Sequence, residues 1–154
     1  KIDARVAKEL AIALIQEKEL EEAIVLAKNK ILEMDRLPFE GKTLRLFGSM
    51  NEWGKKSNMT PKFEYKGGGV FSTTVTLSKG KHEFKIAPMD WDFDFGAFDD
   101  KKEVGIEEKT PLIKKPGSPN LILELDSETG LIFSLAVSKE NEAILSISKN
   151  SSRN

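Results

Sequence analysis

Three aspartates alternate along one short segment, at Asp90, Asp92 and Asp94, and a glycine follows two residues later. Clustered carboxylates are the oxygen ligands that Ca²⁺ prefers, so a calcium loop is one hypothesis for this segment. An EF-hand is excluded, because Phe95 stands at its glycine position and Lys101 stands at its twelfth position instead of glutamate. An irregular calcium site and a solvated acidic loop both stay open, and we predict no bound metal and no cofactor.

The same carboxylates could form the acid pair of a glycosidase, which needs two carboxyl groups at a set separation. Spacing within one loop does not establish that geometry, and a chain of 154 residues has little room for a deep cleft. The one histidine, His82, shares the alternation of Phe84 and Ile86, so we expect it to be a structural residue of the core. Cysteine is absent, which excludes thiol catalysis and disulfides. We therefore predict that the protein is not an enzyme.

Two tryptophans stand in the loops that follow strand-like runs. Trp53 lies in the segment Gly48–Gly54 directly after Phe47, and Trp91 lies just past the run that contains Lys85. Strand alternation places Lys85 on the face opposite Phe84, away from the core. Binding residues are common on loops held by a rigid scaffold, so both tryptophans are candidate ligand contacts, with coverage of the end of the domain as the alternative.

Short alternating runs after Pro38 predict a mainly β fold, an antiparallel sandwich of about seven strands. The expected strands span residues 43–47, 62–65, 70–77, 82–87, 120–125, 131–137 and 143–148. Alternation predicts that their core residues include Leu44, Leu46, Phe71, Val75, Leu77, Phe84 and Ile86. Residues 88–119 are expected to form one long irregular segment, of a kind that is more often functional than idle, with Phe93, Phe95 and Phe98 packed inside it.

The first 37 residues have a different composition from the rest of the chain. All nine phenylalanines, both tryptophans, the tyrosine, all 11 glycines and all six prolines lie at or after Pro38. Apolar residues at helical spacing among Ala, Glu, Lys and Leu predict an α-helical segment, either one long helix or a hairpin that turns at residues 17–19 and resembles a single tetratricopeptide-type hairpin. The predicted organisation is a helical segment (1–38), a β-sandwich module (39–149) and a disordered tail (150–154).

Charge and hydropathy exclude two classes of partner. The chain has 24 basic and 25 acidic residues, so nothing indicates a nucleic-acid ligand. No stretch approaches the ~20 apolar residues of a membrane span. Because the chain begins with Lys1 instead of methionine, we expect a processed or excised fragment.

An ordered set of segments resembles the starch- and glycogen-binding modules attached to pullulanases and related α-glucan-active proteins. The resemblance extends from Thr43 to Ser148 and leaves the helical segment out. It rests on the strand and loop Leu44–Gly54 (LRLFGSMNEWG), on Gly69-Val70-Phe71, on Glu83-Phe84-Lys85-Ile86-Ala87, on Asp90-Trp91 and on Phe95-Gly96. Modules of this family are immunoglobulin-like sandwiches, which is the fold that the resemblance implies here.

The resemblance also implies a function, the noncatalytic binding of α-1,4-linked glucan such as starch, glycogen, pullulan or maltooligosaccharides. Trp53, Lys85, Trp91 and Asn120 match ligand-contacting positions, and related members often carry asparagine where this chain has Asp94. A pyranose ring offers an apolar face and a hydroxyl rim, which suit tryptophan stacking and Lys or Asn hydrogen bonds. Two such platforms support affinities of roughly millimolar to micromolar Kd. The family favours a secreted or cell-surface location, with the cytoplasm still open.

A second class of function stays open beside sugar binding. In it, the chain is a protein-interaction module whose helical segment docks a protein partner while the sandwich serves as a scaffold. The other interpretation of the helical segment is a spacer that packs on the neighbouring domain or was cut from a longer helical region.

Overall fold

The structure, a computed structural model, describes residues 3–150, apart from the side chains of residues 30–36 and 57. The chain divides into two compact units, Lys1–Lys42 and Thr43–Asn154. Most of the predicted tail at 150–154 lies outside the described residues, and Asn150 donates its backbone N–H to the Gly130 carbonyl at 2.9 Å. No helix in the described part of the chain has the length and apolarity needed to cross a bilayer.

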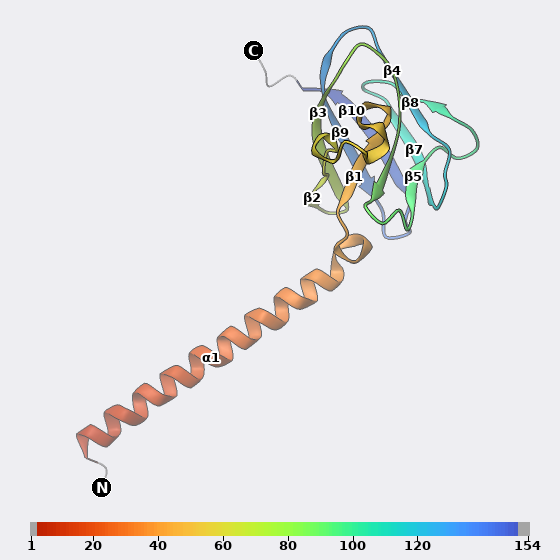
Figure 1. The fold of residues 1–154 in the computed structure, drawn as a ribbon. Coiled ribbons are helices and arrows are strands. Elements are labelled where there is room, and N and C mark those ends of the chain that lie inside the picture. Colours follow the sequence, from red (N-terminus) through yellow and green to blue (C-terminus); the bar gives the residue numbers. More distant parts are fainter. Residues whose placement is uncertain (1–2, 151–154) are drawn as a thin grey trace. The chain divides into compact units, whose positions relative to one another are not determined.

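The first unit contains one continuous helix, α1 (Ala4–Arg36), followed by the 3₁₀ helix η1 (Pro38–Gly41) (Figure 1). A side-chain oxygen of Asp3 accepts the Val6 N–H at 2.9 Å and caps the first turn. The helix runs through residues 17–19, so the hairpin alternative is wrong. No glycine or proline interrupts it, and the helix ends just before Leu37, where the following proline disfavours helical backbone.

The second unit is built from strands (Figure 1). Their bounds are β1 (Leu44–Gly48), β2 (Glu64–Gly67), β3 (Val70–Leu77), β4 (Gly80–Pro88), β5 (Asp94–Gly96), β6 (Lys102–Glu103), β7 (Lys109–Lys115), β8 (Leu121–Leu125), β9 (Thr129–Val137) and β10 (Ala143–Lys149). Two further 3₁₀ helices, η2 (Ser49–Gly54) and η3 (Ser57–Met59), lie between β1 and β2.

The strands form two layers that are joined along one edge. One layer has the order β2-β3-β9-β10-β7. In the other layer, β1 pairs along one edge of β4, whereas β8 and β5 pair one after the other along the opposite edge, and β6 pairs with β8. Pairing of β5 with β7 joins the layers. Every strand pair in the described residues is antiparallel except β6 with β8. The predicted fold class, an antiparallel β-sandwich after an N-terminal helix, is confirmed.

The core between the layers follows the predicted alternation. Of the predicted core residues, six are at most 4% exposed: Leu44, Leu46, Phe71, Leu77, Phe84 and Ile86. Val75 is partly exposed, so the prediction fails at that position. Phe84 of β4 meets Phe133 of β9 edge to face, with ring centroids 5.5 Å apart, which locks one layer onto the other.

The prediction of one long irregular segment at 88–119 is wrong, because β5, β6 and β7 lie within it. The three-residue strand β5 connects the layers: Phe95 pairs with Ile86 of β4 on one side, and Gly96 pairs with Ile113 of β7 on the other. Phe95 is fully buried and Phe93 is 8% exposed, as expected, but Phe98 is 52% exposed. So short a strand has no periodicity to detect and exists only through its neighbours.

Replacing Phe84 with alanine tests the contact between the layers. We expect Phe84→Ala to lower the free energy of unfolding by about 3–5 kcal/mol, because it leaves a cavity against Phe133. Urea denaturation followed by tryptophan fluorescence measures the change. Phe98→Ala is the matched control and should alter stability by less than about 0.5 kcal/mol, because that ring is half exposed. Equal losses in the two variants would contradict this description of the core.

Candidate functional site

The ring of Phe47 is the base of the candidate site. Phe47 ends the apolar part of β1 opposite Lys85 of β4, so both side chains lie on the outward face of this layer. The ring is only 3% exposed, because Trp91 packs on it with centroids 4.8 Å apart and planes tilted by 41°. A buried phenylalanine thus supports a tryptophan on the outside of the sandwich.

Trp91 is held by its turn as well as by Phe47. Its N–H donates to the Pro88 carbonyl at 3.1 Å, and its side chain is partly exposed. Its backbone φ is +52°, in the left-handed region that bulky residues rarely adopt. Backbone strain of this kind persists only where the surroundings impose it, and it is concentrated at functional sites.

Trp53 lies in η2, the loop after β1, and is 37% exposed. Its φ is +57°, so both tryptophans share the left-handed backbone. Gly54 brings this loop against Phe47: a Cβ on the glycine would lie 2.8 Å from a ring carbon of Phe47. The loop that carries Trp53 therefore rests on the same ring as Trp91.

A fully buried asparagine, Asn51, organises this loop. Its Oδ1 accepts the N–H groups of Gly48 and Gly54 at 3.1 and 3.2 Å, and its Nδ2 donates to the Leu46 carbonyl at 2.8 Å. Sequence reasoning missed this residue, because alternation along strands says nothing of a polar side chain that satisfies a loop from inside. Its place in the Gly-Ser-Met-Asn-Glu-Trp-Gly segment is the one signal that pointed to it.

Lys85 faces away from the core as predicted, yet its side chain is only 12% exposed. Its ammonium donates to the Ser118 carbonyl at 2.8 Å and lies 3.5 Å from Asp94 Oδ2. The same nitrogen is 5.5 Å from the centroid of the Trp91 ring, within the range of a cation–π interaction. Lys85 is thus a central part of the site and not a solvated surface lysine.

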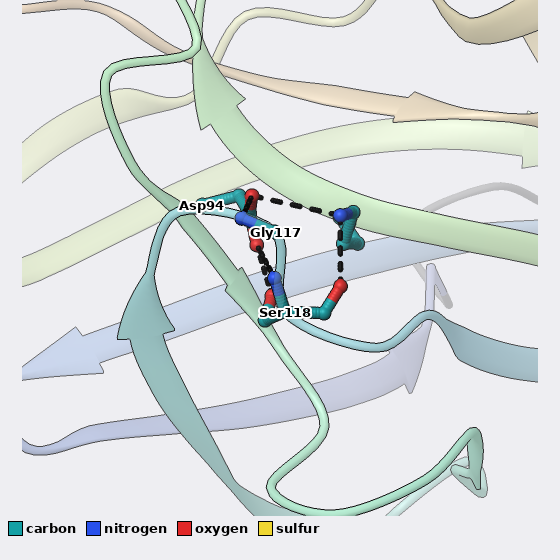
Figure 2. A network of polar contacts seen from close by, with 4 residues as sticks. Asp94, Gly117 and Ser118 are labelled. Atoms are coloured by element: carbon teal, nitrogen blue, oxygen red, sulfur yellow. Dashed lines mark hydrogen bonds and ion pairs between the residues drawn. The ribbon is translucent and has the colours of Figure 1, made fainter.

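The carboxylate of Asp94 is the polar anchor beneath Lys85. Figure 2 shows it joined to the turn at Gly117 and Ser118. Oδ2 accepts the Gly117 N–H at 2.9 Å, Oδ1 accepts the Ser118 N–H at 3.0 Å, and the Ser118 hydroxyl also donates to Oδ1. Asp94 is 2% exposed, so this carboxylate is committed to protein donors inside the domain.

A second polar group lies two residues along β4 from Lys85, on the same outward face. Glu83 Oε1 accepts a hydrogen bond from Lys101 Nζ at 2.8 Å and one from Asn120 Nδ2 at 3.2 Å. The Lys101 bond, followed by the Asn120 bond, holds the pKa of Glu83 below its ordinary value. Sequence reasoning named Asn120 and missed Glu83 and Lys101, although the parity of Glu83 with Lys85 was visible.

The four predicted site residues are therefore gathered on one side of the sandwich to different degrees. Trp91 and Lys85 are in direct contact. Trp53 joins them through Gly54 and Phe47, and Asn120 joins them through Glu83. The arrangement presents aromatic surface beside ammonium, amide and carboxylate groups.

Of the residues considered for catalysis or metal binding, His82 and Asp90 form hydrogen bonds with the backbone. His82 is 7% exposed, and its Nε2 donates to the Ser78 carbonyl at 2.8 Å, as expected of a structural histidine. Asp90 Oδ1 accepts the Asp92 N–H at 3.1 Å. Among the side chains that the structure describes, no three acidic or histidine residues are grouped so as to hold a metal ion.

Comparison with known proteins identifies a shared fold. No family model and no curated protein matches the sequence. The chain is similar to a solved structure titled "Ligand induced structure of AmyP-SBD", a starch-binding domain, with a TM-score of 0.55 and 22% sequence identity. The match covers 71% of this chain and 72% of that one. The sandwich thus has a fold that a carbohydrate-binding module also uses.

Removing the Asp94 carboxylate should destabilise the domain, because Lys85 and Ser118 both contact it. We expect Asp94→Ala to cost about 3–5 kcal/mol in the free energy of unfolding, because it leaves the largely buried Lys85 ammonium and the Ser118 N–H without their acceptor. Asp94→Asn, which keeps an oxygen acceptor and the shape, should cost less. Thermal and urea denaturation measure both variants. A full-size loss in the asparagine variant would show that charge, and not the hydrogen bonds, is what matters.

The Glu83 cluster predicts a pH effect of known sign. Because the pKa of Glu83 is lowered in the folded state, its contribution to stability is present at neutral pH and is lost as the pH falls through that lowered value. An NMR titration of the Glu83 carboxyl carbon should give a midpoint below that of a free glutamate. Lys101→Met should raise the midpoint towards the ordinary value, whereas Lys102→Met, a change at the next lysine, should leave it almost unchanged. Identical midpoints in both variants would contradict the cluster.

Proposed function

We propose that the sandwich is a noncatalytic module that binds α-1,4-linked glucan at the Trp91 site. The observation that carries the proposal is the placement of Trp91: a partly exposed ring, fixed on Phe47 by a left-handed turn, with the Lys85 ammonium 5.5 Å from its centroid. Exposing a tryptophan in a rigid, strained geometry costs stability without adding to the core. A ligand that stacks on the ring gives that geometry a purpose.

Each part of the site has a role that matches one part of a glucose residue. The Trp91 face packs against the C–H face of the pyranose ring, and Trp53 provides a second aromatic surface on the neighbouring loop. Lys85 donates to the Ser118 carbonyl and forms an ion pair with Asp94, and we assign a further N–H of its ammonium, which has three donors, to a sugar hydroxyl. Glu83, further along β4, adds an acceptor, and Asn120, directly before β8, adds a donor. The ligand that fits is neutral and rich in hydroxyl groups.

Binding at a single site of this kind is weak. If stacking hides about 100 Å² of apolar surface, it contributes about 2.5 kcal/mol before the costs of association. Polar contacts to hydroxyls add little net energy, since they replace contacts with water. The expected role is therefore adhesion to a polymer with many equivalent ends and segments, where weak contacts accumulate.

Within the α-glucan binders, we assign the module to the pullulanase-associated, immunoglobulin-like type. The support is the order of its segments: the first strand and its Trp53 loop, the Glu83–Ala87 strand, and Asp90-Trp91 followed by Phe95-Gly96. The likeness in fold to AmyP-SBD supports a carbohydrate-binding module in general. A secreted or cell-surface location accompanies this assignment.

The helix favours a second candidate function, protein interaction through α1. Every side chain of residues 3–29 is exposed, and several of them are large and apolar. These are Val6, Leu10, Ile12, Leu14, Ile15, Leu20, Ile24, Val25 and Leu26. A helix that is apolar on several sides normally packs against other protein. In this alternative the sandwich is a scaffold that binds no sugar.

Affinity electrophoresis of the whole chain tests the glucan proposal. Amylopectin or glycogen in the gel should retard the protein, and Trp91→Ala should abolish most of the retardation by removing the stacking surface. Met89→Ala is the matched control, because Met89 is an exposed neighbour in the same loop and is not part of the site. Circular dichroism confirms that both variants are folded.

Two outcomes would count against the proposal in different ways. Unchanged mobility of the intact protein in both polysaccharides would reject sugar binding and leave the protein-interaction alternative. Full retardation of a folded Trp91→Ala variant would instead remove Trp91 from the site and shift attention to the other aromatic side chains.

A further inference from the structure

Phe98 differs from its two neighbours in the same segment, Phe93 and Phe95. Those rings are 8% and 0% exposed, whereas Phe98, just beyond the end of β5, is 52% exposed. Its exposed ring borders two hollows in the surface, of about 550 and about 370 Å³. Phe98 is thus the exposed phenylalanine of a segment whose other two phenylalanine rings are buried.

The floor of the larger hollow is apolar and belongs to two paired strands. Pro111 of β7 lies directly opposite Ile144 of β10, and both are exposed, Ile144 by 43%. Their chain neighbours Leu112 and Ala143 are buried and face the core. Pro111 and Ile144 therefore project from the outward face of this layer and form, with Phe98, one apolar surface.

The larger hollow is also lined by polar residues. Glu140, Asn141 and Glu142 line it from the turn between β9 and β10, and Lys114 lines it from β7. The Ser138 hydroxyl fixes that turn by accepting the N–H groups of Glu140 and Glu142 at 3.2 and 3.1 Å. The backbone that carries these carboxylate and amide groups is thus fixed beside the apolar surface.

We propose that this hollow is a second α-glucan-binding site. This proposal rests on the proposed glucan-binding function of the Trp91 site. A volume of about 550 Å³ is in the range of small-ligand sites. The exposed ring and its apolar floor suit the C–H face of a sugar, and the rim offers acceptors for hydroxyl groups. Two carboxylates on the rim disfavour an anionic ligand, so a neutral polyhydroxylated chain fits better than a nucleic acid or an acidic peptide.

The hollow is close enough to Trp91 along the chain for both sites to bind one polymer. Trp91 precedes β5 in the chain and Phe98 follows it, and the seven Cα–Cα steps from one to the other span at most about 25 Å. Two weak sites on one rigid domain bind a polymer more tightly than either does alone, because the second contact becomes intramolecular. The two sites would engage two segments of one branched glucan or two neighbouring chains.

Titration of the ¹⁵N-labelled whole chain with maltoheptaose, followed by NMR, tests this proposal. We expect two groups of backbone amides to shift: one around Trp91 and Lys85, and one around Phe98, Asn141 and Ile144. In Trp91→Ala only the second group should respond, and in Phe98→Ala only the first. Tyr65→Ala removes a partly exposed aromatic on β2, outside both sites, and should leave both responses intact.

The outcomes separate this inference from the proposed function. A response around Trp91 with none around Phe98, at up to about 10 mM sugar, would overturn the second site alone. No response anywhere would reject the glucan function together with it. A second readout is binding to glycogen: Phe98→Ala should weaken it about 10-fold or more while leaving the maltoheptaose affinity of the Trp91 site unchanged. Equal glycogen binding by Phe98→Ala and the unaltered chain would also overturn the proposal.

Discussion

The buried carboxylate of Asp94 is the interaction on which the candidate site depends. It stands at the start of β5, the three-residue strand that joins the two layers, and it binds the turn at Gly117 and Ser118. The same turn supplies the carbonyl that holds Lys85, and Lys85 lies beside Trp91. One charged group thus connects the joint between the layers to the aromatic surface. An acidic residue is costly to bury, so its donors must be in place before the site can form.

Phe47 has the corresponding role among the apolar contacts. Trp91 packs on its ring, and the Trp53 loop approaches it so closely that only glycine fits at position 54. Both tryptophans have left-handed backbone, a conformation that the loops would not adopt alone. The packing of the loops against one ring, with the hydrogen bonds of buried Asn51, compensates for this strain. The result is a rigid aromatic surface, which suits a weak ligand because little further ordering is needed on binding.

Each of the seven expected strands exists. Eight or nine residues, as in β3 and β4, carry enough alternation to reveal which face is buried, and the five-residue strands β1 and β8 still alternate in part between apolar and polar residues. The strands β5, β6 and β7 were missed: two of them have only three and two residues, and proline interrupts β7 at position 111. Phe98 was expected to be packed like Phe93 and Phe95. In the structure, Phe95 within β5 and Phe93 directly before it are buried, whereas Phe98, which lies beyond the end of β5, is exposed.

The sequence by itself determined the helical character of residues 4–36, the sandwich that follows, its main core residues and the loop placement of both tryptophans. These features depend on local propensity and on a period of two, which neighbouring residues reveal. The tertiary structure decided that the helix is continuous, that Lys85 pairs with a buried Asp94, and that Glu83 joins Asn120 and Lys101. The side-chain contacts of Lys85 and Glu83 join residues up to 37 positions apart in the sequence. Strand pairing, such as that of β4 with β8, brings these residues together.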